Sequence, residues 1–168
     1  MTPFSFRQLF ALAFLGCLSA MGFALYLQHF QGLEPCPLCI FQRVAMIAAG
    51  LVFLAGALHG PRGGGRWAYA VLAALAAGAG IAIASRHVWL QSLPPDQVPA
   101  CGPTLAYLMD MLPFKEVIET VLQGDGECAK INGVFLGLSL PWWTLVAFTG
   151  FTLYALAAPV LARKDSAP

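Results

Sequence analysis

The sequence predicts an all-α membrane protein: a four-transmembrane-helix bundle in a single domain over residues 1–168, with a short amphipathic helix at the membrane interface. Composition is the first reason, because 59% of the 168 residues are hydrophobic and only 10% are charged. Soluble domains carry about 25% charged residues. The formal net charge of +1 also argues against a nucleic-acid partner. The second reason is a set of long apolar runs, and the third is one short amphipathic segment.

Four apolar runs cover about 9–27, 40–58, 67–84 and 142–161. Each has roughly 18–20 residues, which at ~1.5 Å per residue crosses a ~30 Å hydrocarbon layer as a helix. A helix satisfies its own backbone groups there. The first run could instead be a signal peptide with Arg7 as its charged start. It is longer than the usual ~7–15-residue apolar region and lacks a clean cleavage site.

Lysine and arginine predict the orientation of these spans, because cytoplasmic loops carry an excess of both. Five basic residues flank one side of the four spans: Arg7, Arg62, Arg66, Arg163 and Lys164. We therefore expect both termini to be cytoplasmic. The two larger loops, about 28–39 and 86–140, then lie outside.

A short segment of the second outer loop has helical periodicity. Its apolar residues are Phe114, Val117, Ile118, Val121 and Leu122, and its charged residues on the opposite face are Lys115, Glu116 and Glu119. This pattern is typical of an amphipathic helix that lies on a membrane surface. Such a helix would hold the loop close to the bundle.

Position separates the five cysteines into two kinds. Cys17 lies within the first apolar run, where a cysteine is usually a small packing residue. The other four, Cys36, Cys39, Cys101 and Cys128, fall in the outer loops, where disulfides form and persist.

Cys36-Pro37-Leu38-Cys39 leads directly into the second span. Cys-x-x-Cys is the spacing of dithiol oxidoreductases, and a helix N-terminus favours the thiolate. Haem attachment needs a histidine next in sequence, and residue 40 is isoleucine. Zinc remains an alternative, since Cys101 and Cys128 would complete a site of four thiolates.

Arg43 lies one helical turn after Cys39, just below the expected membrane surface. A charge in a span is costly unless it serves a site. Arg43 either reaches up as an interface anchor, or stabilises a thiolate and binds a polar headgroup docked between helices. His87 lies at the outer end of the third span, where it is either an ordinary interface residue or faces Arg43 across the bundle.

Cys101 and Cys128 both lie among turn-forming residues. Cys101 is in a proline- and glycine-rich stretch over 94–103, and Cys128 follows Gly124-Asp125-Gly126-Glu127. One interpretation is a plain structural disulfide. The other is a labile bond that exchanges readily, as exposed disulfides in flexible loops do.

The run Glu34-Pro35-Cys36-Pro37-Leu38-Cys39-Ile40-Phe41-Gln42-Arg43 resembles the signature of DsbB-type disulfide bond formation proteins. The likeness extends over nearly the whole chain. It includes Gly124-Asp125-Gly126-Glu127-Cys128-Ala129 and the following Phe135-Leu136-Gly137-Leu138. His87 matches a position that lies near the quinone in that family. Gln42 departs from the pattern, because some relatives have an acidic residue there.

The resemblance implies a thiol:quinone oxidoreductase of the bacterial inner membrane, with periplasmic outer loops. It implies disulfides Cys36–Cys39 and Cys101–Cys128, a periplasmic thioredoxin-fold partner of DsbA type, and ubiquinone or menaquinone as acceptor. Arg43 and His87 would bind the quinone, and no metal is implied.

Two alternatives remain open at this point. A vitamin K epoxide reductase-like enzyme has similar chemistry, although Cys-x-x-Cys at the second span and a second pair between the third and fourth spans favour the DsbB type. A cysteine-based metal transporter should show polar groups deep within its spans, and these are nearly absent from the sequence.

Overall fold

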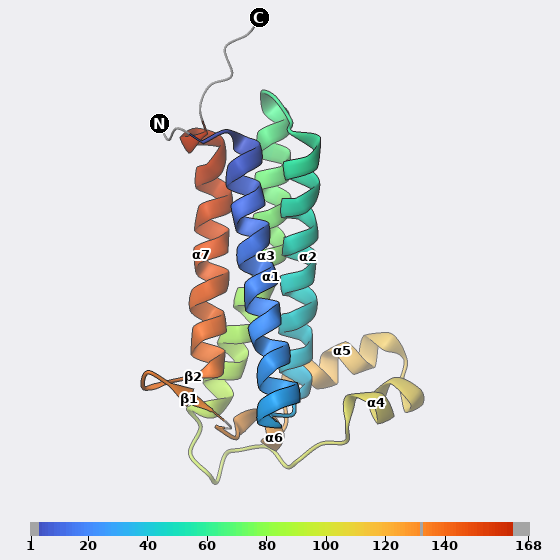
Figure 1. The fold of residues 1–168 in the computed structure, drawn as a ribbon. Coiled ribbons are helices and arrows are strands. Elements are labelled where there is room, and N and C mark those ends of the chain that lie inside the picture. Colours follow the sequence, from blue (N-terminus) through green and yellow to red (C-terminus); the bar gives the residue numbers. More distant parts are fainter. Residues whose placement is uncertain (1–3, 132, 163–168) are drawn as a thin grey trace, which may run out of the picture.

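A computed structural model describes residues 4–131 and 133–162; Arg163 and Lys164, used above for the orientation, lie outside them. Four long helices form an antiparallel bundle: α1 (Phe6–Gln31), α2 (Pro37–His59), α3 (Gly64–Gln91) and α7 (Leu140–Leu161) (Figure 1). All four are long and apolar enough to cross a membrane. The predicted all-α four-helix bundle is therefore confirmed.

Local sequence signals explain where the first two helices begin and end. Ser5 caps α1 in a reciprocal arrangement with the side chain of Gln8. Gly32 ends α1 and Gly60 ends α2, each in the left-handed conformation that glycine adopts at little cost (φ 66° and 60°). Pro37 occupies the first turn of α2, where its missing N–H costs nothing, and Cys36 is the N-cap.

Small residues on α3 allow close packing of the bundle. α3 packs against both α2 and α7, and α1 packs mainly against α2. Gly80 on α3 lies directly beneath the ring of Phe148 on α7, so that an added Cβ would lie 2.3 Å from Phe148 Cε1. Small side chains let helix backbones approach in this way within lipid. At the opposite end of the core the rings of Phe10 and Phe53 meet edge to face.

The remaining elements gather at the end of the bundle where α2 and α7 begin (Figure 1). They are α4 (Leu105–Met111), α5 (Phe114–Gln123), α6 (Gly126–Ala129) and an antiparallel hairpin of β1 (Val134–Phe135) and β2 (Leu138–Ser139). α4 and α5 lie roughly across the bundle axis (Figure 1). The first and last helices start and finish at the opposite end (Figure 1).

α5 is the amphipathic helix that the sequence predicts. Val117 and Val121 are buried in a cluster with Leu38 of α2 and Leu90 of α3. Lys115 is 86% exposed on the opposite face, where it pairs with Glu119. The apolar face thus packs α5 against the end of the bundle.

The long helices extend beyond the apolar runs, most of all α3. Its last turns include Arg86 and His87, which follow the apolar run that ends near residue 84. Arg86 donates to the carbonyl oxygens of Leu122 and Gln123 at 3.2 and 2.8 Å. A cation at these unpaired carbonyls stabilises the C-terminus of α5. Contacts between residues far apart in the sequence therefore accompany the extra turns of α3. A hydropathy profile averages neighbouring residues only, so it does not detect such contacts.

Candidate active site

The two cysteines of the Cys-x-x-Cys motif meet at the start of α2. Cys36 is the N-cap and Cys39 lies in the first turn, and their Sγ atoms are 3.2 Å apart. A disulfide requires about 2.05 Å, so both residues are thiols in this structure and need only a small movement to join. The free N–H groups of the helix start stabilise negative charge on these sulfurs.

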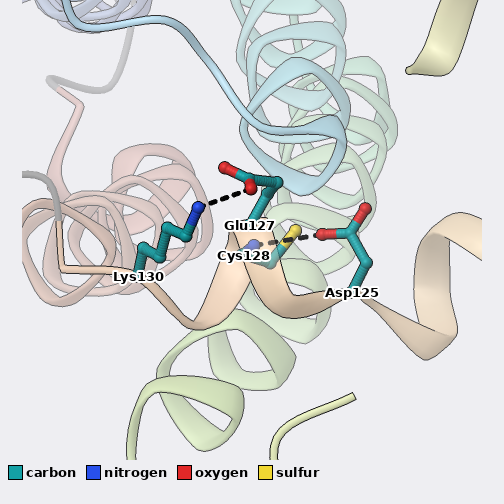
Figure 2. Close-up of polar contacts among 4 residues, drawn as sticks. All are labelled: Asp125, Glu127, Cys128 and Lys130. Carbon is teal, nitrogen blue, oxygen red and sulfur yellow. Dashed lines mark hydrogen bonds and ion pairs between the residues drawn. The ribbon is translucent and has the colours of Figure 1, made fainter. Parts of the chain in front are cut away.

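Cys128 approaches the same pair from the second loop. Asp125 caps α6 by accepting a hydrogen bond from the backbone N–H of Cys128 at 3.1 Å (Figure 2). The Cys128 side chain is only 1% exposed. A hydrogen bond with Cys36, together with burial, strongly raises the pKa of the Cys128 thiol. The short helix α6 therefore holds Cys128 against Cys36.

Cys101 lies on the outside of this arrangement and is exposed. Its segment runs along α6, where the N–H of Gly126 donates to Ala100 O at 3.2 Å. A Cβ at Gly126 would lie 2.8 Å from the backbone carbonyl oxygen of Pro99 and 3.2 Å from Cys101 Sγ, so the absence of a side chain at Gly126 allows this close approach. The predicted disulfide partners Cys101 and Cys128 therefore flank one short turn, although both are free thiols here.

The acidic residue Glu127 changes the pKa of the exposed Cys101 thiol. Glu127 accepts a hydrogen bond from Cys101, and its negative charge raises the pKa of that thiol. Lys130 lies 2.6 Å from the Glu127 carboxylate (Figure 2) and lowers the pKa of Glu127. Glu127 therefore stays ionised beside Cys101.

His87 connects the Cys-x-x-Cys pair to α3. Its Nε2 lies 3.8 Å from Cys36 Sγ, and its Nδ1 lies 4.0 Å from Cys39 Sγ. Gln42 donates to Nδ1 at 3.1 Å, and Thr144 of α7 donates to Gln42 Oε1 at 2.7 Å. His87 and Gln42 are almost fully buried, at 2% and 5% exposure. Side chains from α2, α3 and α7 thus form one series of polar contacts, which runs from Thr144 through Gln42 and His87 to the two sulfurs.

Sequence reasoning found His87 but not the contribution of Gln42 and Thr144. The spacing of Gln42, three residues after Cys39, does predict that it shares the thiol face of α2. No sequence pattern marks Thr144 as part of the site, because it contacts Gln42 across 102 residues of the chain.

Arg43 turns toward α1. It donates to Gln28 Oε1 at 2.5 Å and to the carbonyl oxygen of Ala24 at 3.3 Å. These bonds direct Arg43 toward α1, and Arg43 and His87 both line the same cavity. The Arg43 guanidinium still interacts electrostatically with the Cys39 thiol.

A cavity of about 450 Å³ opens beside the two sulfurs. Most of its wall is apolar and comes from α1, α2 and α7, with Phe23, Met46 and Phe148 among the lining side chains. Its polar lining includes Cys39, Arg43, His87, Gln42 and Thr144. A mostly apolar cavity with a few converging polar groups is typical of a small-molecule site.

These features define a helical membrane protein with a vicinal dithiol at the edge of an apolar cavity. A protein-family model described as "Disulfide bond formation protein DsbB" matches residues 6–158. A "Disulfide bond formation protein B" of Hahella chejuensis is 56% identical over 146 residues, covering 87% of this chain and 88% of that protein. Proteins of the same description from Xanthomonas campestris pv. campestris and Marinobacter nauticus are 53% and 51% identical, each over 94–95% of both chains. The chain belongs to the DsbB family.

Proposed function

We propose that this chain is an inner-membrane thiol:quinone oxidoreductase that reoxidises a periplasmic thioredoxin-fold oxidant of DsbA type and passes the electrons to membrane quinone. One observation carries the proposal. The Cys36–Cys39 pair lies between the buried thiol of Cys128 on one side and an apolar cavity on the other. A dithiol in this position can accept electrons from a loop and deliver them to an apolar acceptor.

The first half of the reaction is thiol–disulfide exchange. A thiolate of the reduced partner attacks the exposed Cys101 of a Cys101–Cys128 disulfide, and Cys128 leaves as a thiol. The partner's second thiolate then releases Cys101 and closes the partner's own disulfide. Cys128 next attacks Cys36 of the Cys36–Cys39 disulfide, with which it is already in contact, and Cys39 leaves. Cys101 resolves the Cys128–Cys36 bond, so two electrons and two protons end on Cys36 and Cys39.

The lining of the cavity fits a quinone, which has a flat apolar body and two oxygens that accept hydrogen bonds. A quinone bound there accepts the two electrons and two protons of the dithiol and leaves Cys36–Cys39 oxidised. Arg43 is placed to donate a hydrogen bond and to stabilise the Cys39 thiolate. His87 lies within reach of both sulfurs and can take up or supply a proton.

The distribution of charge supports the periplasmic side for the cysteines. Arg7 and Arg66 lie at the end of the bundle opposite the Cys-x-x-Cys pair, close to where α1 and α3 begin. Because positive residues concentrate on the cytoplasmic side, this end is cytoplasmic in our proposal, and so are both termini.

The metal-transporter alternative has less support. Among the residues described, the buried polar side chains are Gln42, His87 and Ser139. All three belong to the end of the bundle that holds the cysteines. A transporter needs polar groups along a path through its spans, and the middle of this bundle is instead packed with phenylalanine and alanine.

The proposal is tested by quinone reduction with a reduced DsbA-type protein as electron donor, followed for five single variants. We expect Cys36→Ser, Cys39→Ser, Cys101→Ser and Cys128→Ser to abolish steady-state turnover. Cys17→Ser is the control, because that thiol is buried in the bundle core and away from the relay. Full turnover in Cys101→Ser or in Cys39→Ser would refute the relay.

A further inference from the structure

The sulfurs of Cys36 and Cys39 and the imidazole of His87 form a compact cluster of three ligand atoms, all within 4.8 Å of one another. We propose that the reduced form of this chain binds one zinc-class ion through these three residues, with Cys128 as the fourth ligand. The ion would occupy the dithiol between turnovers and block it. The inhibitory part rests on the function proposed above, whereas the binding itself does not.

The spacing of the cluster suits zinc. With Zn–S of about 2.3 Å and Zn–N of about 2.0–2.1 Å, a tetrahedral site separates two sulfurs by about 3.8 Å and a sulfur from a nitrogen by about 3.5 Å. The two sulfurs are 3.2 Å apart, and Cys36 Sγ lies 3.8 Å from His87 Nε2. The two sulfurs therefore need to separate by about 0.6 Å and Cys36 Sγ to approach Nε2 by about 0.3 Å. Cys39 Sγ, which lies 4.0 Å from Nδ1, has to turn toward Nε2, and rotation of the cysteine side chains and the His87 ring supplies this movement.

Cys128 completes a set of three thiolates and one imidazole, which is a common composition of zinc sites. It already contacts Cys36 and acts electrostatically on Cys39. Its burial at 1% exposure keeps competing water away. Cys101 lies outside the cluster, so the all-cysteine site considered from the sequence is replaced by one in which His87 takes the place of Cys101.

Gln42 provides the orienting partner that a metal-bound histidine requires. Such a histidine binds through one nitrogen and donates the other N–H to an acceptor. Gln42 is 3.1 Å from His87 Nδ1, and turning its amide presents the oxygen to an Nδ1–H group. Thr144 then accepts from the amide nitrogen while it donates to Pro141 O, a bond already present at 2.9 Å. His87 Nε2 is left free for the ion.

Charge also favours the site. Three thiolates and one Zn²⁺ leave one net negative charge, and the Arg43 guanidinium acts electrostatically on one of these sulfurs, that of Cys39. Thiolate ligands select zinc or cadmium over magnesium and calcium. Binding releases the thiol protons, and oxidation of Cys36 and Cys39 to a disulfide removes two ligands. Occupation by zinc and transfer of electrons through the pair therefore exclude each other.

The test uses the purified full-length protein in detergent, reduced with a phosphine and freed of metal. Zn²⁺ is titrated in competition with a chromophoric chelator, and Cd²⁺ is added separately to follow sulfur-to-metal absorbance in the ultraviolet. We expect one ion per chain in the reduced wild type and in Cys101→Ser, and none in the protein with Cys36 and Cys39 oxidised. Cys39→Ser and His87→Ala should bind at least about tenfold more weakly, and Gln42→Leu roughly tenfold more weakly.

Three results would overturn the proposal: equal affinity in His87→Ala and wild type, equal weakening by Cys101→Ser and Cys39→Ser, or tight binding by the oxidised protein. Helix content measured by circular dichroism confirms that each variant is folded. Gln42→Leu keeps all four ligands, so its weaker binding reports the orienting bond and not the loss of a ligand. No quinone or partner protein enters this assay. A failed relay with intact zinc binding therefore refutes the proposed function alone, and the converse refutes only the metal site.

Discussion

Replacing Gly80 with alanine should both destabilise the bundle and narrow the cavity. The added Cβ would lie 2.3 Å from Phe148 Cε1 and 2.5 Å from Cδ1 and Cζ, far inside van der Waals contact. Phe148 is fully buried and also lines the cavity, so its ring can move away from α3 chiefly by entering that space.

The size of the effect follows from two opposing terms. Alanine in place of glycine within a helix gains about 1 kcal/mol of helix propensity. Overpacking of a filled core costs about 1–3 kcal/mol. Gly78 is the matched control, because it lies on the same helix and a Cβ there would meet nothing within 4 Å. Gly78→Ala receives the gain alone, so the two variants should differ by about 1–3 kcal/mol.

The stability assay is unfolding of each variant in mixed micelles with increasing sodium dodecyl sulfate, followed by loss of helicity. Quinone reduction is the second assay, in which Gly80→Ala should raise the KM for quinone while Gly78→Ala leaves it unchanged. If Gly80→Ala is as stable as Gly78→Ala and has the same KM, the close packing of α3 on α7 is not as described.

Three further predictions concern charged side chains around the site. Glu127→Gln should lower the pKa of Cys101, because the carboxylate that raises it is gone; the pH midpoint for alkylation of reduced Cys101 therefore moves down. Arg86→Gln removes two bonds to the C-terminal carbonyls of α5, so amide hydrogen exchange should accelerate across that helix. Arg43→Leu should slow quinone reduction roughly 10- to 100-fold, since a charged hydrogen bond contributes about 1.5–3 kcal/mol, and Arg43→Lys should recover part of the rate.

The first two of these predictions each have a control on the same surface. Glu119→Gln removes a carboxylate that pairs with Lys115 on α5, and it should leave the alkylation midpoint of Cys101 in place. Lys115→Gln breaks that exposed pair and should leave exchange across α5 nearly unchanged. An unshifted midpoint in Glu127→Gln, or equal exchange rates in Arg86→Gln and Lys115→Gln, would contradict the contacts described here.

Hydropathy and periodicity account for most of the fold. Four apolar runs are sufficient to predict four spans, because a lipid-exposed helix has no polar face to confuse the signal. The amphipathic spacing of residues 114–122 likewise predicts α5. The two-residue strands of the hairpin could not be predicted, since a pattern of period two needs several residues to be visible. Its position depends instead on Trp143, which donates to Phe135 O at 2.9 Å.

The candidate site was only partly predictable for a similar reason. Motif spacing identifies Cys36 and Cys39, and the position of Arg43 follows from the helix repeat. The direction of a long side chain is set by tertiary contacts, and Arg43 finds its acceptors on α1, 15 and 19 residues earlier in the chain. The contact between Cys128 and Cys36 depends on the cap of α6 at Asp125 and on the docking of the second loop, which no local pattern encodes.

The contrast between exposed Cys101 and buried Cys128 has a consequence for leakage of electrons. Small thiols in the surrounding solution can collide with any sulfur that water reaches, and each such collision drains oxidising power without making a useful disulfide. In the proposed relay Cys101 is the most exposed of the four sulfurs, since Cys36 and Cys39 are partly buried and Cys128 is buried. Glu127 repels the anionic thiolates that would attack Cys101. The inner three sulfurs are thus less accessible to solvent than Cys101, and Cys101 is the main point at which electrons enter. A protein partner that docks at Cys101 can therefore reduce the relay rapidly, whereas a small thiol in solution reduces it only slowly.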